Sequence, residues 1–419
     1  MGMKSLNDTS NLRINSDRLM ADVNALAWIG RQEGTGITRT AFSPAYQQAT
    51  TWLSERMQDA GMKTRVDAIG NVIGSKGPSE GRIVMTGSHI DTVRNGGPLD
   101  GAYGVLAGIE VARVLSENDF PLKTPYEVVA FADEEGNYLS LLGSRGITGS
   151  LDEEMLETAA DWQETPLSTV MSNYGFNMAD FKAAAYPENS IRTFLELHIE
   201  QGPVLENLGL DIGVVGGIVG LRNMTFRFLG KSNHAGTTPM NMRKDALRAA
   251  ADFVSRAYGV LDLNDNSSVR MTFGSIRVKP NQPNVIAREA AVSLDCRDLD
   301  VNRIASVCRE IEFIALDVAR QYELNVEFDN NTMDAPAIMA PSVVDLVREC
   351  TDRLGYSNQE MQSGAGHDAQ EMSRICDTGM IFVPSIGGLS HHPDEWTASE
   401  SLAKGANVLL HSILRLMST

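Results

Sequence analysis

The stretch Arg82-Ile-Val-Met-Thr-Gly-Ser-His-Ile-Asp-Thr92 is followed, nine residues after Asp91, by Asp100-Gly101. Its first five residues form a short apolar run that predicts a buried strand. The loop after that strand is rich in glycine and holds His89, Asp91 and Asp100. Imidazoles and carboxylates bind divalent metal ions. The loop therefore predicts part of a metal site whose other ligands lie elsewhere in the chain.

The length and composition predict a two-domain globular protein. A chain of 419 residues exceeds the usual size of a single hydrophobic core. The net charge of −18 (36 − 54) argues against a nucleic-acid or anionic-membrane surface, and no apolar run reaches the roughly 18 residues of a membrane span. The four cysteines form no disulfide framework, and the N-terminus has no apolar signal core. We expect a soluble cytoplasmic protein.

The first half of the chain predicts an α/β domain. Strands are expected at 82–86, 126–132 and 193–202 and a hairpin at 64–73, with helices at 16–30, 43–61 and 101–115. The order strand, helix, strand over 82–132 predicts a parallel βαβ unit. Parallel strands end at one edge of the sheet, where α/β proteins place their sites. The acidic groups after residues 86 and 132 should therefore lie together.

A second domain is predicted inside the first. After Ile212, strands are expected within 214–229 and at 269–277, 285–295 and 323–328, with helices at 243–258 and 301–322. This alternation predicts an α+β sandwich over 213–329. The first domain would comprise 1–212 and 330–419, closing with helices at 341–354 and 398–417 around a strand at 380–384.

Six of the seven histidines lie in predicted loops or at strand ends, and only His411 falls inside an amphipathic helix. A lone loop histidine is more often a surface residue than a ligand, but several beside acidic residues indicate a metal site. A two-metal hydrolytic site needs about two ligands for each metal and one shared carboxylate. The chain offers five such ligands: His89, Asp100, Glu135, His198 and either His391 or His392.

Two further carboxylates have supporting roles in this interpretation. Asp91, two residues after His89, can accept the imidazole N–H and fix its tautomer, although it could also be an ordinary loop cap. If Glu135 binds metal, Glu134 points elsewhere and can take a proton from water and pass it to a leaving amine. Otherwise, both glutamates are simply solvated acids at a strand end.

Six motifs together resemble the hydantoinase/carbamoylase branch of the aminoacylase/carboxypeptidase-like metallohydrolases. The resemblance covers nearly the whole chain and implies a mixed, mostly parallel catalytic domain with a di-metal site, plus an inserted α+β lid and dimerisation domain. The motifs are His89-Ile-Asp91, Asp100-Gly101, Asp133-Glu-Glu-Gly136, His198-Ile-Glu-Gln-Gly202, Gly230-Lys-Ser-Asn-His-Ala-Gly-Thr-Thr-Pro-Met240 and Ser390-His-His-Pro-Asp-Glu395.

The resemblance implies a role for each candidate ligand. One metal would be bound by His89 and His198 and the other by Glu135 and His391, with Asp100 bridging them. His391 is preferred to His392 because it follows Ser390 in the family pattern Ser-His-x-Pro-x-Glu. Glu134 would be the general base and acid, with Asp91 supporting His89. The two metals would be zinc or manganese first, although cobalt or nickel also suits these ligands.

The resemblance also implies substrate-binding residues. His234 would reach the neighbouring subunit's active site in a homodimer formed through the inserted domain, and polarise the scissile carbonyl. Gln201, Asn284 and Arg297 match substrate-binding positions, with Arg297 as a bidentate fork for a carboxylate. The alternative for Arg297 is an ion pair with Asp295 or Asp298. Asn281, like Asn284, lies in a Pro-Asn-Gln-Pro-Asn turn, where asparagine is also common for conformational reasons.

The implied activity is hydrolysis of N-carbamoyl-L-amino acids to free amino acid, CO2 and ammonia. Allantoate amidohydrolase is the nearest alternative, and a dipeptidase or N-acyl amino acid deacylase is more distant. A catalytically inactive binding protein would lack a ligand or Glu134, and none is missing. One departure from the family is the short loop Asn137-Tyr-Leu-Ser140, which replaces a longer loop beside the substrate pocket. The loop at Gly364–Asp368 is expected to form a wall of the site.

Overall fold

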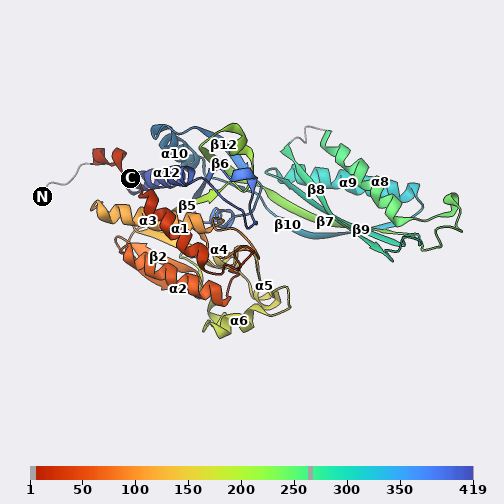
Figure 1. Cartoon of the computed structure of the whole chain (residues 1–419), viewed down its shortest axis with the longest axis horizontal. Coiled ribbons are helices and arrows are strands. Elements are labelled where there is room, and N and C mark those ends of the chain that lie inside the picture. Colours follow the sequence, from red (N-terminus) through yellow and green to blue (C-terminus); the bar gives the residue numbers. More distant parts are fainter. Residues whose placement is uncertain (1–5, 263–267, 419) are drawn as a thin grey trace. The chain divides into compact units, whose positions relative to one another are not determined.

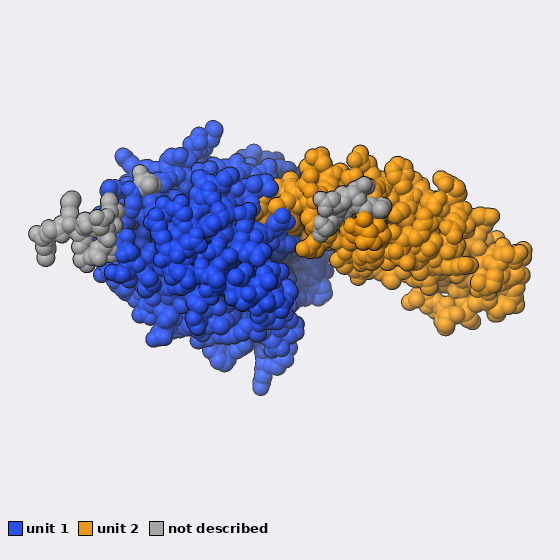
Figure 2. All heavy atoms as spheres, turned by 90° about the horizontal axis from the view of Figure 1, so that it is seen from above, with its two compact units in different colours: residues 1–216, 338–419 blue, residues 217–337 orange. Residues whose placement is uncertain are grey.

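The computed structural model describes residues 6–262 and 268–418 (Figure 1). The chain divides into two compact units, coloured separately in Figure 2. Unit 1 comprises Met1–Gly216 and Ile338–Thr419, and unit 2 comprises Gly217–Ala337. The prediction placed the insert at 213–329. Unit 2 continues beyond residue 329 because its last strand, β10, runs from Asn325 to Asp334.

Unit 1 is built on a nine-stranded sheet of order β1-β2-β4-β3-β5-β13-β6-β11, with β12 paired to β6. The four central strands β4, β3, β5 and β13 are parallel, while β1, β2 and β6 pair antiparallel. The predicted mixed, mostly parallel α/β fold is thus confirmed. The strands are β1 Lys63–Val66, β2 Val72–Lys76, β3 Ile83–His89, β4 Tyr126–Phe131, β5 Ile191–Ile199, β6 Ile212–Ile218, β11 Ala337–Ile338, β12 Asn358–Ser363 and β13 Asp377–Val383.

The five helices predicted for unit 1, which are α1, α2, α3, α10 and α12 of the structure, begin and end near the predicted limits. Ser43 caps α2 by accepting the Tyr46 N–H, and Asn15 caps α1 by accepting the Arg18 N–H. The α-helices are α1 Ser16–Trp28, α2 Pro44–Asp59, α3 Ala102–Glu117, α4 Leu142–Thr148, α5 Glu153–Thr158, α6 Leu167–Asn173, α7 Val204–Leu208, α10 Pro341–Arg353, α11 Asp368–Met372 and α12 Ser399–Ser418. The 3-10 helices are η1 Leu6–Asn11, η2 Met178–Ala184 and η6 Ile386–Gly388.

The centre of unit 1 is buried on both faces. Every residue of β4 is buried, as are the residues of β3 after Ile83, as expected for parallel strands covered on both faces. Helix α3 packs closely on this sheet. A Cβ at Gly104 would collide with the Leu197 carbonyl oxygen of β5, so only glycine allows this approach. The loop before α3, which carries Asp100, is thereby held against the sheet.

Unit 2 is a four-stranded antiparallel sheet of order β10-β7-β9-β8, with helices α8 and α9 packed on it around one core (Figure 1). Strand β9 starts later than the predicted residue 285, because the Ile286 N–H donates to Asn233 and the Ala287 oxygen accepts from Ala246. No helix among the described residues is both long and apolar enough to cross a membrane. The elements are β7 Gly220–Leu229, η3 Met240–Met242, α8 Ala246–Ala257, η4 Tyr258–Asp262, β8 Arg270–Lys279, β9 Glu289–Asp298, α9 Val301–Gln321 and β10.

Candidate metal and active site

The parallel strands of unit 1 bring the predicted ligands to one edge of the sheet. His89 ends β3, and His198 is the last residue but one of β5. Glu134 and Glu135 follow β4 after a turn at Asp133, which has a left-handed φ of 55°. The Asp133 carboxylate accepts the backbone N–H groups of residues 137, 138 and 139, so the short loop folds back on this turn. This turn fixes where the two glutamates leave the strand.

Asp100 lies between three imidazoles. Its Oδ1 is 3.2 Å from Nε2 of His198 and 3.5 Å from Nε2 of His89. Its Oδ2 is 3.2 Å from Nε2 of His391. The two oxygens of one carboxylate thus face different histidines, as a bridging ligand requires.

The surrounding atoms form two ligand sets that share Asp100. One set is His89, Asp100 and His198, and the other is Asp100, Glu135 and His391, with the ligand atoms of each set within 4.8 Å of one another. Oε2 of Glu135 lies 3.4 Å from Nε2 of His391, while its buried Oε1 has no hydrogen-bond partner among the described residues. Burial and the nearby Asp100 raise the pKa of Glu135 to about 7. Crowded, buried carboxylates with an unpartnered oxygen fit a pair of divalent cations.

The two buried imidazoles are oriented by backbone oxygens. Nδ1 of His89 is 3.0 Å from the Asp91 carbonyl oxygen, and Nδ1 of His198 is 2.8 Å from the Ile199 carbonyl oxygen. A proton on each Nδ1 leaves a lone pair on Nε2 that can bind a metal, and on His198 this lone pair accepts the Gly101 N–H at 3.1 Å. The Asp91 carboxylate is farther, with its Oδ1 at 3.8 Å, and its Oδ2 accepts the Glu135 N–H at 3.2 Å. The residue expected to orient His89 is therefore in place, but its peptide oxygen makes the close contact.

Glu134 stands beside the ligand cluster without joining either set that contains Asp100. Its Oε2 is 3.5 Å from Nε2 of His89, and the residue is 9% exposed. Burial raises the pKa of Glu134 well above its usual range, although His89 opposes this. A carboxyl group in this setting can exchange a proton with a group bound near the cluster.

Three side chains hold Asp100 in place, and two of them, Ser390 and Glu395, were not predicted to have a role. Buried Glu395 accepts the N–H groups of Leu99 and Asp100 at 2.9 and 3.0 Å. The Ser390 hydroxyl lies 2.7 Å from Asp100 Oδ2 and 2.9 Å from Glu395 Oε2. Gln201, a predicted substrate-binding residue, donates from Nε2 to Asp100 Oδ2 at 2.8 Å. The available sequence signal was the Ser390–Glu395 motif, which contains both missed residues.

Gly101 provides a direct test of this packing. Its φ is +63°, and a Cβ at this position would collide with the His89 ring. We expect Gly101→Ala to tilt that imidazole and to weaken cation binding by about 10–100-fold, the usual effect of disturbing the surroundings of a ligand. Cation affinity measured by chelator competition checks this. Gly209→Ala is the matched control, since Gly209 also has positive φ (+64°) but no atom within 4 Å of the added Cβ. Equal affinities in both variants would contradict the expectation.

The predicted substrate-binding residues other than Gln201 lie in unit 2. His234 and Asn284 are exposed neighbours, because the Ala235 N–H donates to the Asn284 carbonyl and His234 forms a β-bridge with Val285. Asn281, in the same turn, has a left-handed φ of 58°. On β9, Arg297 forms a bidentate ion pair with Asp295 at 2.8 and 2.9 Å. An ion pair with Asp295 or Asp298 was the predicted alternative to binding a substrate carboxylate. The substrate-binding roles of these residues remain predictions.

The other histidine candidates have different surroundings. His392 is exposed and accepts the Asp394 N–H through Nδ1. His367, in the expected wall loop, packs edge-on against His198 at 4.6 Å between ring centroids.

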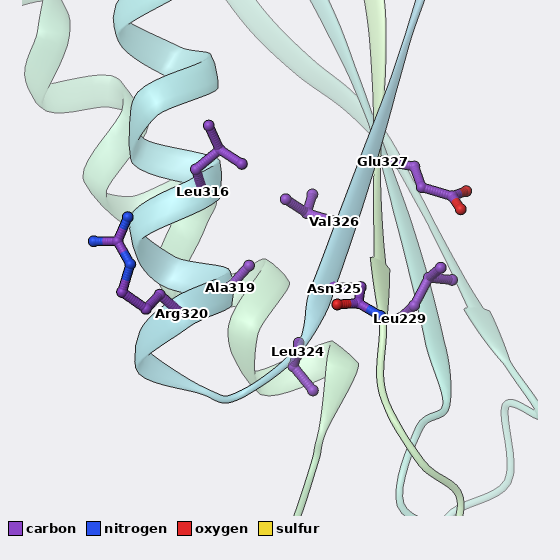
Figure 3. A pocket seen from close by; sticks show the side chains of 8 residues that line it. All are labelled: Leu229, Leu316, Ala319, Arg320, Leu324, Asn325, Val326 and Glu327. Atoms are coloured by element: carbon purple, nitrogen blue, oxygen red, sulfur yellow. The ribbon is translucent and has the colours of Figure 1, made fainter.

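A hollow of about 620 Å³ in unit 2, between α9 and β10 (Figure 3), is lined by none of the predicted site residues. Its lining residues are Leu229, Leu316, Ala319, Arg320, Leu324, Asn325, Val326 and Glu327.

A mixed α/β sheet with two imidazole and carboxylate sets that share one aspartate near the carboxyl ends of its parallel strands is an arrangement that fits a metal-dependent hydrolase. Residues 85–415 match peptidase family M20/M25/M40, and the chain belongs to this family. The predicted resemblance is confirmed.

Within this family, the chain is similar over most of its length to several amidohydrolases. The chain is 36% identical over 382 residues to an N-carbamoyl-L-amino-acid amidohydrolase of Paenarthrobacter aurescens, covering 90% of this chain and 92% of the relative. It is 34% identical over 399 residues to the allantoate amidohydrolase of Escherichia coli K12, covering 93% and 96%. A solved amidase of the hydantoinase/carbamoylase family from Burkholderia multivorans matches with a TM-score of 0.89 and 31% identity, over 96% and 98% of the two chains.

Proposed function

We propose that the protein is an amidohydrolase that cleaves the ureido C–N bond of N-carbamoyl-L-amino acids. One water is consumed, and the products are the free amino acid, CO2 and ammonia. The observation that carries the proposal is Asp100, shared between two ligand sets with Glu134 beside them. The 36% identity to an N-carbamoyl-L-amino-acid amidohydrolase supports this substrate class.

Two divalent cations would be held by the five ligands described above. His89 and His198 would serve one cation, Glu135 and His391 the other, and Asp100 both. Zinc or manganese are the first candidates, and cobalt or nickel also suit imidazole and carboxylate ligands. When bound, such ions polarise a carbonyl group and lower the pKa of water.

The side chains of the protein perform the remaining steps. Glu134 takes a proton from the attacking water and delivers it to the leaving nitrogen. His234 of the partner subunit donates a hydrogen bond to the carbonyl oxygen as negative charge develops on it. Gln201, Asn281 and Asn284 bind the substrate, and Arg297 binds its carboxylate once released from Asp295.

We further propose a cytoplasmic homodimer formed through unit 2, with that unit acting as a lid. Strand β8 lies at one edge of its four-stranded sheet and pairs only with β9 among the described strands. Ile276 on this strand is 50% exposed. A free strand edge with apolar side chains is a surface onto which a second copy can pair.

The proposed activity is tested by ammonia release from a panel of substrates. Protein purified and supplied with Mn²⁺ or Zn²⁺ is expected to release ammonia from at least one N-carbamoyl-L-amino acid and not from its D-enantiomer. Removal of the cations with a chelator should abolish the activity, and readdition should restore it. Allantoate, dipeptides and N-acetyl amino acids are the comparison substrates. Ammonia release from allantoate alone, or cleavage of dipeptides alone, would contradict the proposal.

A further inference from the structure

Arg39 is a fully buried cation close to the proposed metal site. Among the lysines and arginines of residues 6–262 and 268–418, it is the one that is completely shielded from solvent. Within the same residues, it makes no ion pair with a carboxylate shorter than 4 Å. A buried guanidinium without such a partner is costly unless its N–H groups are otherwise satisfied. The contacts of Arg39 therefore indicate what it stabilises.

The Arg39 guanidinium donates to backbone carbonyls in two segments. Its Nε donates to the Ile90 oxygen at 2.6 Å, and its Nη1 donates to the oxygens of Leu26 and Ile29 at 3.1 and 2.8 Å. Leu26 is in the last turn of α1, and Ile29 caps that helix. Arg39 thus joins the C-terminal end of α1 to the peptide between His89 and Asp91.

The Arg39 backbone holds the other side of Asp91. Its N–H donates to the Thr92 hydroxyl at 3.0 Å, and its carbonyl accepts the Thr92 N–H at 3.1 Å. The residues before and after Asp91 are therefore both tied to Arg39. Between them, the Asp91 carbonyl accepts the His89 imidazole N–H.

We propose that Arg39 is a positioning residue of the metal site, which fixes the peptide of Asp91 and thereby the direction of Nε2 of His89. This inference rests on the proposed two-cation site. Arg39 touches none of the ligand atoms and acts through the loop between His89 and Thr92. Its positive charge also faces Asp91, one of several buried carboxylates around the cluster. Lysine could supply this charge but not the planar fork that reaches both segments.

The test uses Arg39→Met and Arg39→Lys, with the cation sites filled by Co²⁺. We expect Arg39→Met to weaken Co²⁺ binding by about 10–100-fold at one of the two sites, as loss of a ligand-orienting partner usually does. The visible absorption of the bound Co²⁺ should change in position or intensity, because it reports ligand geometry. Arg39→Lys should give a smaller loss. Chelator competition and absorption spectroscopy measure these effects without any turnover.

Arg113→Met is the matched control. Arg113 is also largely buried and binds α1, through Asp22 at 2.5 Å, but among the residues that the structure describes its ion pairs are with Asp22 and Glu110 and not with the loop of residues 89–92. Its loss should lower thermal stability while leaving Co²⁺ affinity and spectrum as in the wild type. Wild-type affinity and spectrum in Arg39→Met, or equal losses in Arg113→Met, would overturn the inference. If Arg39→Met does not fold, Arg39→Lys takes its place, and its Co²⁺ affinity and spectrum are compared with those of the wild type and of Arg113→Met. A wild-type protein that bound no cation would instead overturn the proposed function.

Discussion

Asp100→Ala is expected to lose tight binding of both cations and at least about 1,000-fold of kcat/KM. The reason is that Oδ1 faces His89 and His198 while Oδ2 faces His391, so one side chain serves both ligand sets. Cations in such sites contribute several kcal/mol of transition-state stabilisation, and each 1.4 kcal/mol is about tenfold in rate. Metal content by elemental analysis and kcat/KM for the best N-carbamoyl substrate measure the two effects.

The Asp100→Ala variant needs a control that separates loss of metal from loss of fold. Asp345→Ala removes an exposed carboxylate on α10, which pairs only with Arg348 in the described contacts, and should keep both cations. Burial opposes the charge of Asp100, but contacts with His198, His391 and His89 hold the pKa of its carboxyl well below its usual range, so the substitution also removes favourable contacts. Circular dichroism of the metal-free variant therefore has to show that it is still folded. Two cations and full activity in Asp100→Ala would show that Asp100 does not bridge them.

The overall fold was predictable because its signals are local. The apolar runs before His89 and Glu134, with a helical segment between them, predict parallel strands ending at one edge, and the structure places them so. The limits of the predicted helices differed by at most three residues from those of the structure. At the start of α1, Asn15 and Ser16 are both good N-caps, and the sequence alone does not decide between them.

The ligand set required more than local signals. Spacing alone could not choose between His391 and His392, and the resemblance favoured His391. The structure places Nε2 of His391 3.2 Å from Asp100 Oδ2, whereas His392 Nδ1 accepts the Asp394 N–H. His391 also has a left-handed φ of 55°, a strained conformation of the kind that clusters at functional sites.

The supporting contacts could not be predicted because they join residues far apart in the chain. The Glu395 carboxylate binds the amides of residues 99 and 100, nearly 300 positions away, and no periodic pattern encodes such a contact. Arg39 is a similar case, since nothing in its sequence context indicates burial. For Arg297, two interpretations were open from the sequence, and in the structure its guanidinium forms an ion pair with Asp295.

Glu134→Gln is expected to retain both cations and lose about 100- to 10,000-fold in kcat, the usual contribution of a positioned general acid–base group. Glutamine has nearly the same shape but cannot take or deliver the proton. Because Glu134 is buried beside other carboxylates, removing its charge relieves repulsion and should not lower the stability of the metal-free protein. Steady-state kinetics, elemental analysis and thermal melting of this variant measure kcat, metal content and stability.

Glu135→Gln is the matched control, since it alters the adjacent residue by the same chemical change. Glu135 belongs to the ligand set with Asp100 and His391, so its variant should lose one cation, and added metal should partly restore its activity. Glu134→Gln should keep its low kcat at any metal concentration, because its cations are already bound and only proton transfer is missing. Wild-type kcat in Glu134→Gln, or recovery of its activity with added metal, would assign the proton transfer to another group.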